Sequence, residues 1–248
     1  MRKIPVLGTQ TLNSTTNLKN LIKSIDYPVE LLSVVVNNEN FDILLEVKEF
    51  CDNIKNDNIE KIDISFHPSN LGCPASWNYH FKQYPYADFY IKADDDDVFS
   101  PNDLSDMVKC IEEGAGFVKF KTGYTCFGIT KDTLNKVGLF DENYFPCNYE
   151  DDDYTIRLNL ARINEVTISR DIKHIWSGTS RNLLDPTVEH AKMAEYIIQT
   201  EEYFIKKWGG RFPGNYRAPF NNNEKDIKSI DYNFEYRERK IFRCNYTK

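Results

Sequence analysis

Four consecutive aspartates, Asp94–Asp97, follow the apolar run "FYIKA" and carry the strongest chemical signal in the sequence. Neighbouring carboxylates repel one another by up to ~4 kcal/mol per pair at the effective dielectric of a protein surface, so a compensating positive charge is expected. Mg²⁺ and Mn²⁺ are held by one or two carboxylates together with phosphate oxygens of a substrate. The run therefore predicts a site for Mn²⁺ or Mg²⁺, against the alternative of an acidic loop that faces solvent.

A second acidic segment, "NYEDDDYTIRL" (148–158), lies at the start of an expected helix, where the helix dipole favours negative charge. The chemistry that needs both segments is the departure of a nucleoside diphosphate. A cation at the first segment neutralises the charge that grows on the leaving group. A carboxylate of the second segment can take the proton of an attacking hydroxyl.

Apolar runs rich in β-forming residues alternate with segments of helical period, which predicts a parallel sheet covered by helices on both faces. The expected strands are 4–9, 31–36, 62–66, 88–93, 117–120 and 125–130, and the expected helices are 18–25, 43–50, 74–84, 100–114, 131–137, 149–162 and 187–208. The acidic run begins where strand 88–93 ends. Ligands of open α/β sheets bind at that edge.

Composition narrows the function further. The chain has 248 residues and a net charge of -7, which argues against general binding of nucleic acid. We find no secretory signal and no apolar run of ~20 residues that could span a membrane. The cytoplasm is therefore the predicted location, in the host cell if the protein is viral. The six scattered cysteines are expected to be reduced and mostly buried.

The order of the motifs resembles that of the inverting glycosyltransferases of family 2, which have the GT-A fold. The resemblance covers residues 4–180 and rests on Thr9, the Asn37-Asn38 pair, "NLGCPASWN" (70–78), the acidic run with "V..P..L" after it, "GLFDENYFPCNYEDDDYTIRL" (138–158) and "HIWSGTS" (174–180). It implies transfer of a sugar from a UDP- or GDP-sugar to a hydroxyl of a glycan or other acceptor, with Mn²⁺ or Mg²⁺ as cofactor.

The resemblance also implies a role for each matching residue. The residues expected at the nucleotide sugar are Thr9, Asn37, Asn38, Asp94, Asp95 and Asp96. The residues expected to bind the metal are Asp95, Asp97 and His174. In catalysis, Asp151 is expected to act as the base and Glu150 to assist it. The register within the four aspartates stays open. Asn37 stands where the family usually has Asp, and Trp77 stands where Arg is often found, so the donor's identity stays open too.

The predicted fold class is α/β: a GT-A fold with a Rossmann-like, mostly parallel central sheet flanked by helices and a C-terminal helical extension. We expect a GT-A catalytic domain at 1–184, with a nucleotide-sugar-binding half at 1–115 and an acceptor half at 116–184. Residues 185–248 are expected to form a helix and an irregular strap packed on the same domain. There, Lys207, Arg211 and Arg217 are interpreted as a solvated basic face rather than a diphosphate clamp.

Two other functions stay open on the residues alone. One is a metal-dependent phosphoryl-transfer enzyme or nuclease, which acidic clusters also serve. The other is a non-catalytic module that binds a glycan or a cation. The negative net charge and the lack of a basic groove in the sequence weigh against the nuclease.

Overall fold

The computed structural model describes residues 2–12, 15–54, 56–175, 186–211 and 242–247, with side chains described for all of these except 186–193 and 242–247. Trp176 and Arg217 therefore lie outside the described residues. None of the described helices offers a stretch that is long and apolar enough to span a lipid bilayer. The predicted cytoplasmic location stays a prediction.

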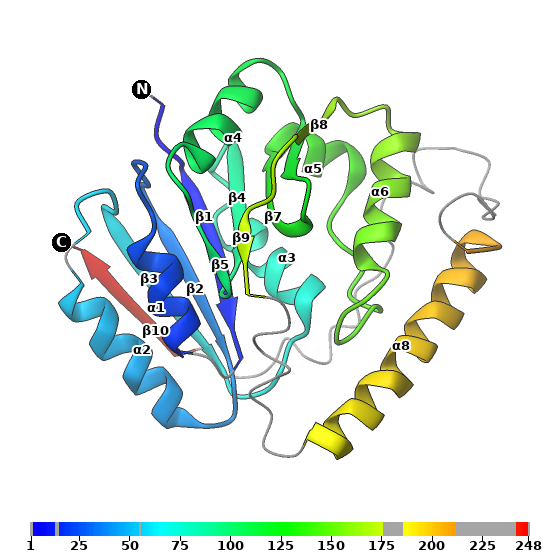
Figure 1. The fold of residues 1–248 in the computed structure, drawn as a ribbon, viewed down its shortest axis with the longest axis horizontal. Helices are drawn as coiled ribbons and strands as arrows, with labels where there is room; N and C mark the ends of the chain where they lie inside the picture. Colours follow the sequence, from blue (N-terminus) through cyan, green and yellow to red (C-terminus); the bar gives the residue numbers. More distant parts are fainter. Residues whose placement is uncertain (1, 13–14, 55, 176–185, 212–241, 248) are drawn as a thin grey trace.

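A central sheet organises the described part of the chain, in the strand order β10-β3-β2-β1-β4-β7-β6-β8 (Figure 1). Its strands are β1 (Val6–Thr11), β2 (Leu32–Asn37), β3 (Lys61–His67), β4 (Phe89–Asp94), β6 (Phe117–Phe120), β7 (Gly123–Thr130), β8 (Glu165–Ile168) and β10 (Phe242–Thr247). Strands β3, β2, β1 and β4 run parallel, β6 runs parallel to β8, and β7 and β10 are antiparallel to their neighbours. The predicted mostly parallel α/β sheet is confirmed.

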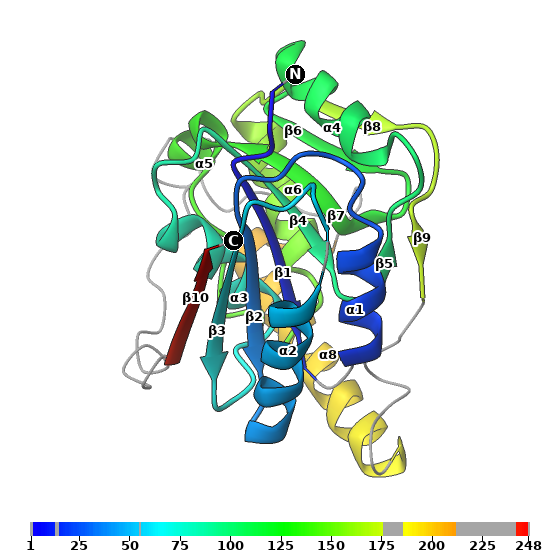
Figure 2. The ribbon, with the colours of Figure 1, turned by 90° about the vertical axis from the view of Figure 1, so that its left-hand side faces the viewer.

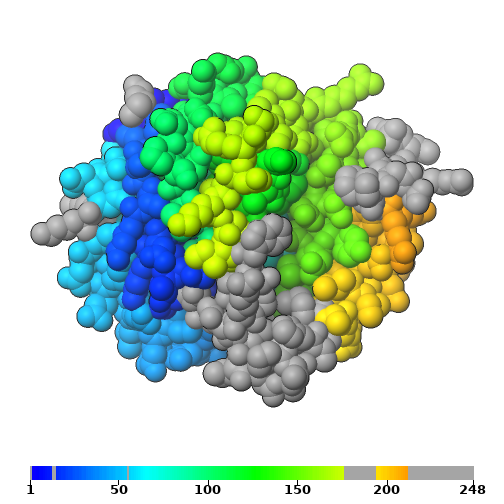
Figure 3. Space-filling model, in the orientation of Figure 1, coloured from blue at the N-terminus to red at the C-terminus, as the bar shows by residue number. Residues whose placement is uncertain are grey.

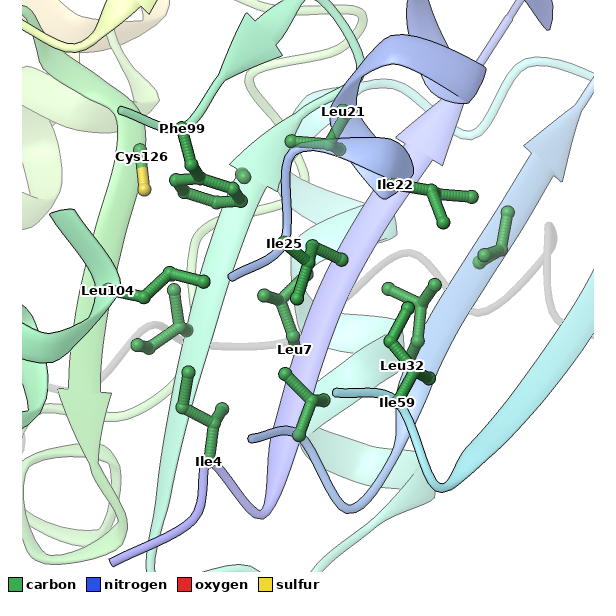
Figure 4. Packing of buried hydrophobic residues seen from close by; sticks show 14 of the residues in the cluster. Ile4, Leu7, Leu21, Ile22, Ile25, Leu32, Ile59, Phe99, Leu104 and Cys126 are labelled. Atoms are coloured by element: carbon green, nitrogen blue, oxygen red, sulfur yellow. The ribbon is translucent and has the colours of Figure 1, made fainter. Parts of the chain in front are cut away.

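Helices cover both faces of this sheet. Apolar side chains of α1 (Thr15–Lys23), α2 (Phe41–Asn53) and α4 (Asp103–Glu112) pack on one face, and those of α3 (Cys73–Gln83), α5 (Lys131–Val137) and α6 (Glu150–Leu160) pack on the other. On the first face, Leu21, Ile22 and Ile25 project from α1 and its C-terminal end onto Leu7 and Leu32 of the sheet (Figure 4). Burial of these side chains fixes the two strands whose ends form the candidate site.

Two elements differ from the sequence prediction. Helix α4 begins at Asp103 rather than near Ser100. Asn102 has a φ of 75°, which a helix cannot contain. The Asp103 carboxylate also accepts the backbone N–H of Ser100 at 2.8 Å. The expected irregular strap contains a strand: β10 pairs with β3 and extends the sheet (Figure 2). Its alternation of apolar and polar residues, "FRCNYT", is strand-like but lies between charged segments.

Helix α8 (Pro186–Trp208) packs through its C-terminal turns against Tyr144 and against Ile156 of α6. Phe204 and Trp208 are fully buried, and the Trp208 indole donates to the Asp153 carboxylate at 2.8 Å. Lys207 lies 2.6 Å from Asp153 and 2.7 Å from Asp141, and its side chain is 11% exposed. The expectation that Lys207 belongs to a solvated face is wrong, because two buried carboxylates bind it.

Of the three basic residues expected on a solvated face, Arg211 fits that expectation. Arg211 is 67% exposed and forms an ion pair with Glu201 at 2.9 Å. Exposed ion pairs of this kind contribute little to stability.

Candidate active site

The acidic run lies where the strand order of the sheet reverses. Strand β1 pairs with β2 on one side and with β4 on the other, and the chain builds β2 and β3 outward before it returns to β4. Ligands of open α/β sheets bind at the carboxyl ends of the strands at such a point. Asp94, the last residue of β4, pairs with Gln10 of β1 there.

Asp97 and His174, which are 77 residues apart in the sequence, meet beside this edge. The short strand β5 (Asp97–Val98) pairs antiparallel with β9 (Lys173–His174), and the segment that carries β9 reaches the surface in the middle of the face shown in Figure 3. The His174 ring Nδ1 lies 2.9 Å from Asp97 Oδ1 and 3.4 Å from Asp96 Oδ1. The motif "HIWSGTS" was predicted to lie beside the acidic run. Its first two residues do lie there.

Burial and charge shift the pKa values of this pair. Asp97 is fully buried, and burial raises its pKa to about 6, although the hydrogen bond with His174 acts in the opposite direction. Burial alone would lower the pKa of His174, but its hydrogen bond with Asp97 and the negative charges of Asp96 and Asp97 outweigh burial and raise it. Both shifts favour the protonated form of the respective group.

Asp95 has the most perturbed carboxyl group of the run. It is 4% exposed, and burial raises its pKa to about 8, opposed by a hydrogen bond with the Thr11 side chain. Its Oδ2 has no hydrogen-bond partner among the described residues. A buried carboxylate oxygen without a partner is costly unless a proton or a cation binds it, so the donor set suits a hard divalent ion.

The described residues nevertheless contain no group of three or more His, Cys, Asp or Glu side chains arranged as a complete metal site. Asp95, Asp97 and His174 would supply only part of a coordination shell. The role of Asp95, Asp97 and His174 as joint metal ligands therefore stays a prediction.

Two side chains bind the carboxylate of Asp94. The Lys92 ammonium and the Gln10 amide both donate to its Oδ1, the latter at 2.6 Å. The backbone N–H of Asp94 donates to Asp97 Oδ2 at 3.0 Å, which ties the two ends of the run together. The four aspartates thus have four different environments.

The residues predicted at the nucleoside are not brought together by the structure. Thr9 lies two residues before the end of β1, is fully buried, and shares its sheet face with Leu7, while Thr11 occupies the strand end. Asn37 ends β2 on the opposite face and donates to Ser76 of α3 at 2.6 Å; its buried Oδ1 has no partner among the described residues. Thr11 was not predicted, because a threonine in a strand is ordinary.

Asn38 shapes the loop that follows β2. Its amide donates to the carbonyl of Leu12, and its Oδ1 accepts the backbone N–H of Asn40 at 2.7 Å. Asn40 then caps α2, since its side chain accepts the N–H of Asp42. Asn38 therefore orders the loops after β1 and β2.

The second acidic segment opens α6, as predicted. Glu150 and Asp151 occupy the first helical turn, directly after Tyr149, which has a φ of 69°. Glu150 is 6% exposed; burial raises its pKa well above the ordinary value, and its Oε2 has no partner among the described residues. Asp151 is half-buried, and its Oδ1 accepts the backbone N–H of Asp152 at 2.9 Å.

Lys92 links the two acidic segments and was missed by sequence reasoning. It is 1% exposed and lies 4.4 Å from the centroid of the Trp77 ring. Its positive charge opposes the rise in pKa that burial causes at Asp95, Asp97 and Glu150. The available signal was a single lysine inside the apolar run before the aspartates.

Two cysteines meet next to Glu150. The N–H of Cys73, at the start of α3, donates to the carbonyl of Pro146 at 2.7 Å, and a hydrogen bond between the thiols of Cys73 and Cys147, with burial, raises the pKa of Cys73. Of the described cysteine side chains, two are buried (Cys51, Cys126) and three are half-buried (Cys73, Cys110, Cys147), so these are not mostly buried as expected. Their reduced state stays a prediction.

No protein-family model matches the chain. A search of curated proteins also finds no match. Among solved structures, residues 1–349 of S. aureus TarS give a TM-score of 0.53 at 17% identity over 83% of this chain and 73% of that one. Glucosyl-3-phosphoglycerate synthase from Mycobacterium tuberculosis, in complex with Mg²⁺ and UDP, gives a TM-score of 0.52 at 12% identity over 86% of this chain and 85% of that one.

With its mostly parallel sheet and two helical layers, this chain has the GT-A fold that the sequence predicted.

Proposed function

We propose that this protein is a glycosyltransferase that moves a sugar from a nucleoside-diphosphate sugar to a hydroxyl group of a glycan or other acceptor, with inversion and with Mn²⁺ or Mg²⁺ bound. The observation that carries the proposal is the contact of Asp97 with His174 at the point where the strand order reverses. It gathers acidic and imidazole ligands from distant segments at the edge where α/β sheets bind nucleotides.

Asp95, Asp97 and His174 would hold the cation. When bound, the cation would neutralise the negative charge that develops on the departing diphosphate. Asp95 Oδ2 supplies the clearest ligand atom, because it is buried and unpartnered. His174 would bind through a neutral ring nitrogen, so its proton must leave as the cation enters.

Asp151 would take the proton of the attacking hydroxyl. It stands in the first turn of α6 and is half-buried, whereas burial holds the pKa of neighbouring Glu150 well above the ordinary value. A base must be ionised before the reaction, which favours Asp151. Glu150, whose raised pKa favours the protonated form, would donate a hydrogen bond to the acceptor and so orient it.

Asn37 and Thr11 would lie nearest the nucleoside, at the ends of β2 and β1. The unpartnered Oδ1 of Asn37 can accept a hydrogen bond from a ring N–H or an amino group of a base. The Thr9 side chain is fully buried, so it can contact the nucleotide sugar only if donor binding exposes the end of β1.

The test is a screen of UDP-, GDP- and dTDP-sugars for metal-dependent thermal stabilisation, followed by transfer assays with the donor that binds. Asp97→Asn should remove the metal-dependent stabilisation. Asp132→Asn, at an exposed position in the first turn of α5, is the matched control and should leave it intact. Full transfer by Asp97→Asn would refute the proposal.

The same assays separate the alternatives. Mn²⁺-dependent cleavage of a nucleic acid, with no donor bound, would indicate a nuclease. A donor that binds and is neither transferred nor hydrolysed would indicate a binding module.

A further inference from the structure

Lys92 is a buried cation to which the proposed mechanism gives no task. Its side chain is 1% exposed, and its ammonium group donates to the Asp94 carboxylate and to the carbonyls of Tyr124 and Thr125 on β7, at 3.3 and 3.1 Å. The Trp77 ring of α3 lies 4.4 Å from Nζ, within the range of a cation–π contact. All three ammonium protons therefore have acceptors, and the group is fixed from three elements.

The contact with Asp94 is one-sided. The Lys92 ammonium and the Gln10 amide both bind Oδ1, and no described residue binds Oδ2. The Asp94 side chain is 25% exposed and stands at the carboxyl end of β4. One oxygen is thus held by the protein, and the other can accept a hydrogen bond from a ligand.

This environment separates Asp94 from its neighbours in chemistry. Asp95 has an unpartnered buried oxygen, whereas Asp94 is paired with a fixed cation. A carboxylate whose charge is already compensated is a poorer ligand for a divalent ion and a suitable acceptor for a neutral hydroxyl group. This environment suits Asp94, which the family resemblance places at the sugar donor, for accepting a hydrogen bond from a hydroxyl group.

We propose that Lys92 is a positioning residue that works through Asp94, fixing one carboxylate oxygen so that the other binds a hydroxyl group of the sugar donor. The inference rests on the proposed function, because the donor supplies that hydroxyl group. It also accounts for a lysine in the middle of a buried strand, where an unpaired ammonium group would be costly.

Kinetics of Lys92→Met, Asp94→Asn and the double variant test the proposal, with the donor identified by the screen. Each single variant should raise KM for the donor about tenfold or more, as expected for loss of a hydrogen bond to a charged group, and should change kcat much less. The double variant should be no worse than the worse single variant, because the two residues act as a unit.

Stability measurements on the same variants guard against a folding defect. Lys92→Met leaves the Asp94 carboxylate without its counterion and should lower Tm by about 10 °C. The double variant leaves no unpaired charge and should regain much of that loss while its KM stays high. A lysine that only tethers β4 to β7 would not separate stability from KM in this way.

Lys119→Met is the matched control. Lys119 also forms an ion pair, with Glu165 at 2.6 Å, and lies 4.8 Å from the centroid of the Tyr124 ring, but no described contact joins it to the acidic run. Its KM should equal that of the wild type. A KM for Lys92→Met within about twofold of this control would overturn the inference alone. If the wild-type protein binds no nucleotide sugar, the proposed function fails first and the inference falls with it.

Discussion

The two acidic runs of this chain, Asp94–Asp97 and Glu150–Asp153, have nearly the same composition and are stabilised in different ways. In the first run, at the end of a strand, individual side chains compensate the negative charges of the carboxylates. The N-terminus of α6 compensates the second, and its last member, Asp153, is fully buried among Arg157, Lys207 and Trp208. Composition alone therefore does not distinguish a structural carboxylate from a functional one.

Hydrogen-bond satisfaction distinguishes some of them. Asp153 has partners for both carboxylate oxygens, whereas Asp95 and Glu150 each keep one buried oxygen without a partner among the described residues. An unpartnered buried oxygen suits a proton, a cation or a ligand. Asp97 is the exception, because His174 and the backbone N–H of Asp94 contact its two oxygens although it is a proposed metal ligand. The predictions below test this distinction within and between the two runs.

The largest expected effect is on catalysis. Asp151→Asn keeps the helix N-terminus intact and removes the proposed base, so kcat should fall by about 10³-fold, equivalent to about 4 kcal/mol. Steady-state transfer assays measure the loss, and an unchanged Tm would show that the fold is intact. A kcat within tenfold of the wild type would assign the base elsewhere.

Asp153→Asn should have the largest effect on stability. It leaves Arg157 without its buried counterion and Lys207 with Asp141 alone, which costs about 3 to 5 kcal/mol. Urea unfolding measures the difference, and the contacts between α8 and the rest of the chain should loosen first. A loss below about 1 kcal/mol would mean that the network is replaceable.

The pH dependence of stability tests the first run. Asp95 and Asp97, with pKa values raised by burial to about 8 and about 6, keep protons that the unfolded chain releases near pH 4. Stability without metal should therefore fall as pH rises from about 4 to 8. The raised pKa of His174 acts in the same direction above about pH 6.5.

Thermal unfolding of the wild type and of Asp95→Asn across this range measures the contribution of Asp95, whose removal should flatten the profile. Mn²⁺ binds the ionised groups, so its stabilising effect should grow over the same interval. A metal effect that is independent of pH would contradict the assignment of these ligands.

Asp152→Asn should have the smallest effect. Asp152 is half-buried, and burial followed by the charge of Asp151 raises its pKa to about 6. Loss of its charge should change the free energy of unfolding by no more than about 0.5 kcal/mol and leave kcat unchanged. It is also the adjacent control for Asp151→Asn.

The sequence predicted the features that depend on local pattern. The alternation of strands and helices, the acidic run at the end of β4 and the start of α6 near Glu150 all follow from periodicity and helix signals. The resemblance to a known family placed Asp97 near His174, which no local pattern could do because the two residues are far apart in sequence.

Features that depend on tertiary packing were missed. The burial of Lys92 requires Trp77 of α3 and the carbonyls of β7, and the contact of Thr11 with Asp95 requires the pairing of β1 with β4. Thr9 was expected at a strand end that lies two residues further on. The register of the ligands within the four aspartates stays a prediction.

Strand β10 closes one side of the sheet with a segment that is distant from β3 in the sequence. Without it, the backbone N–H and C=O groups of β3 would form an open edge that can template pairing with another chain. A variant that lacks residues 242–247 should therefore tend to self-associate even while the acidic site, several strands away, still binds its ligand. Self-association and ligand binding at the candidate active site are therefore expected to depend on opposite ends of the β10-β3-β2-β1-β4 array.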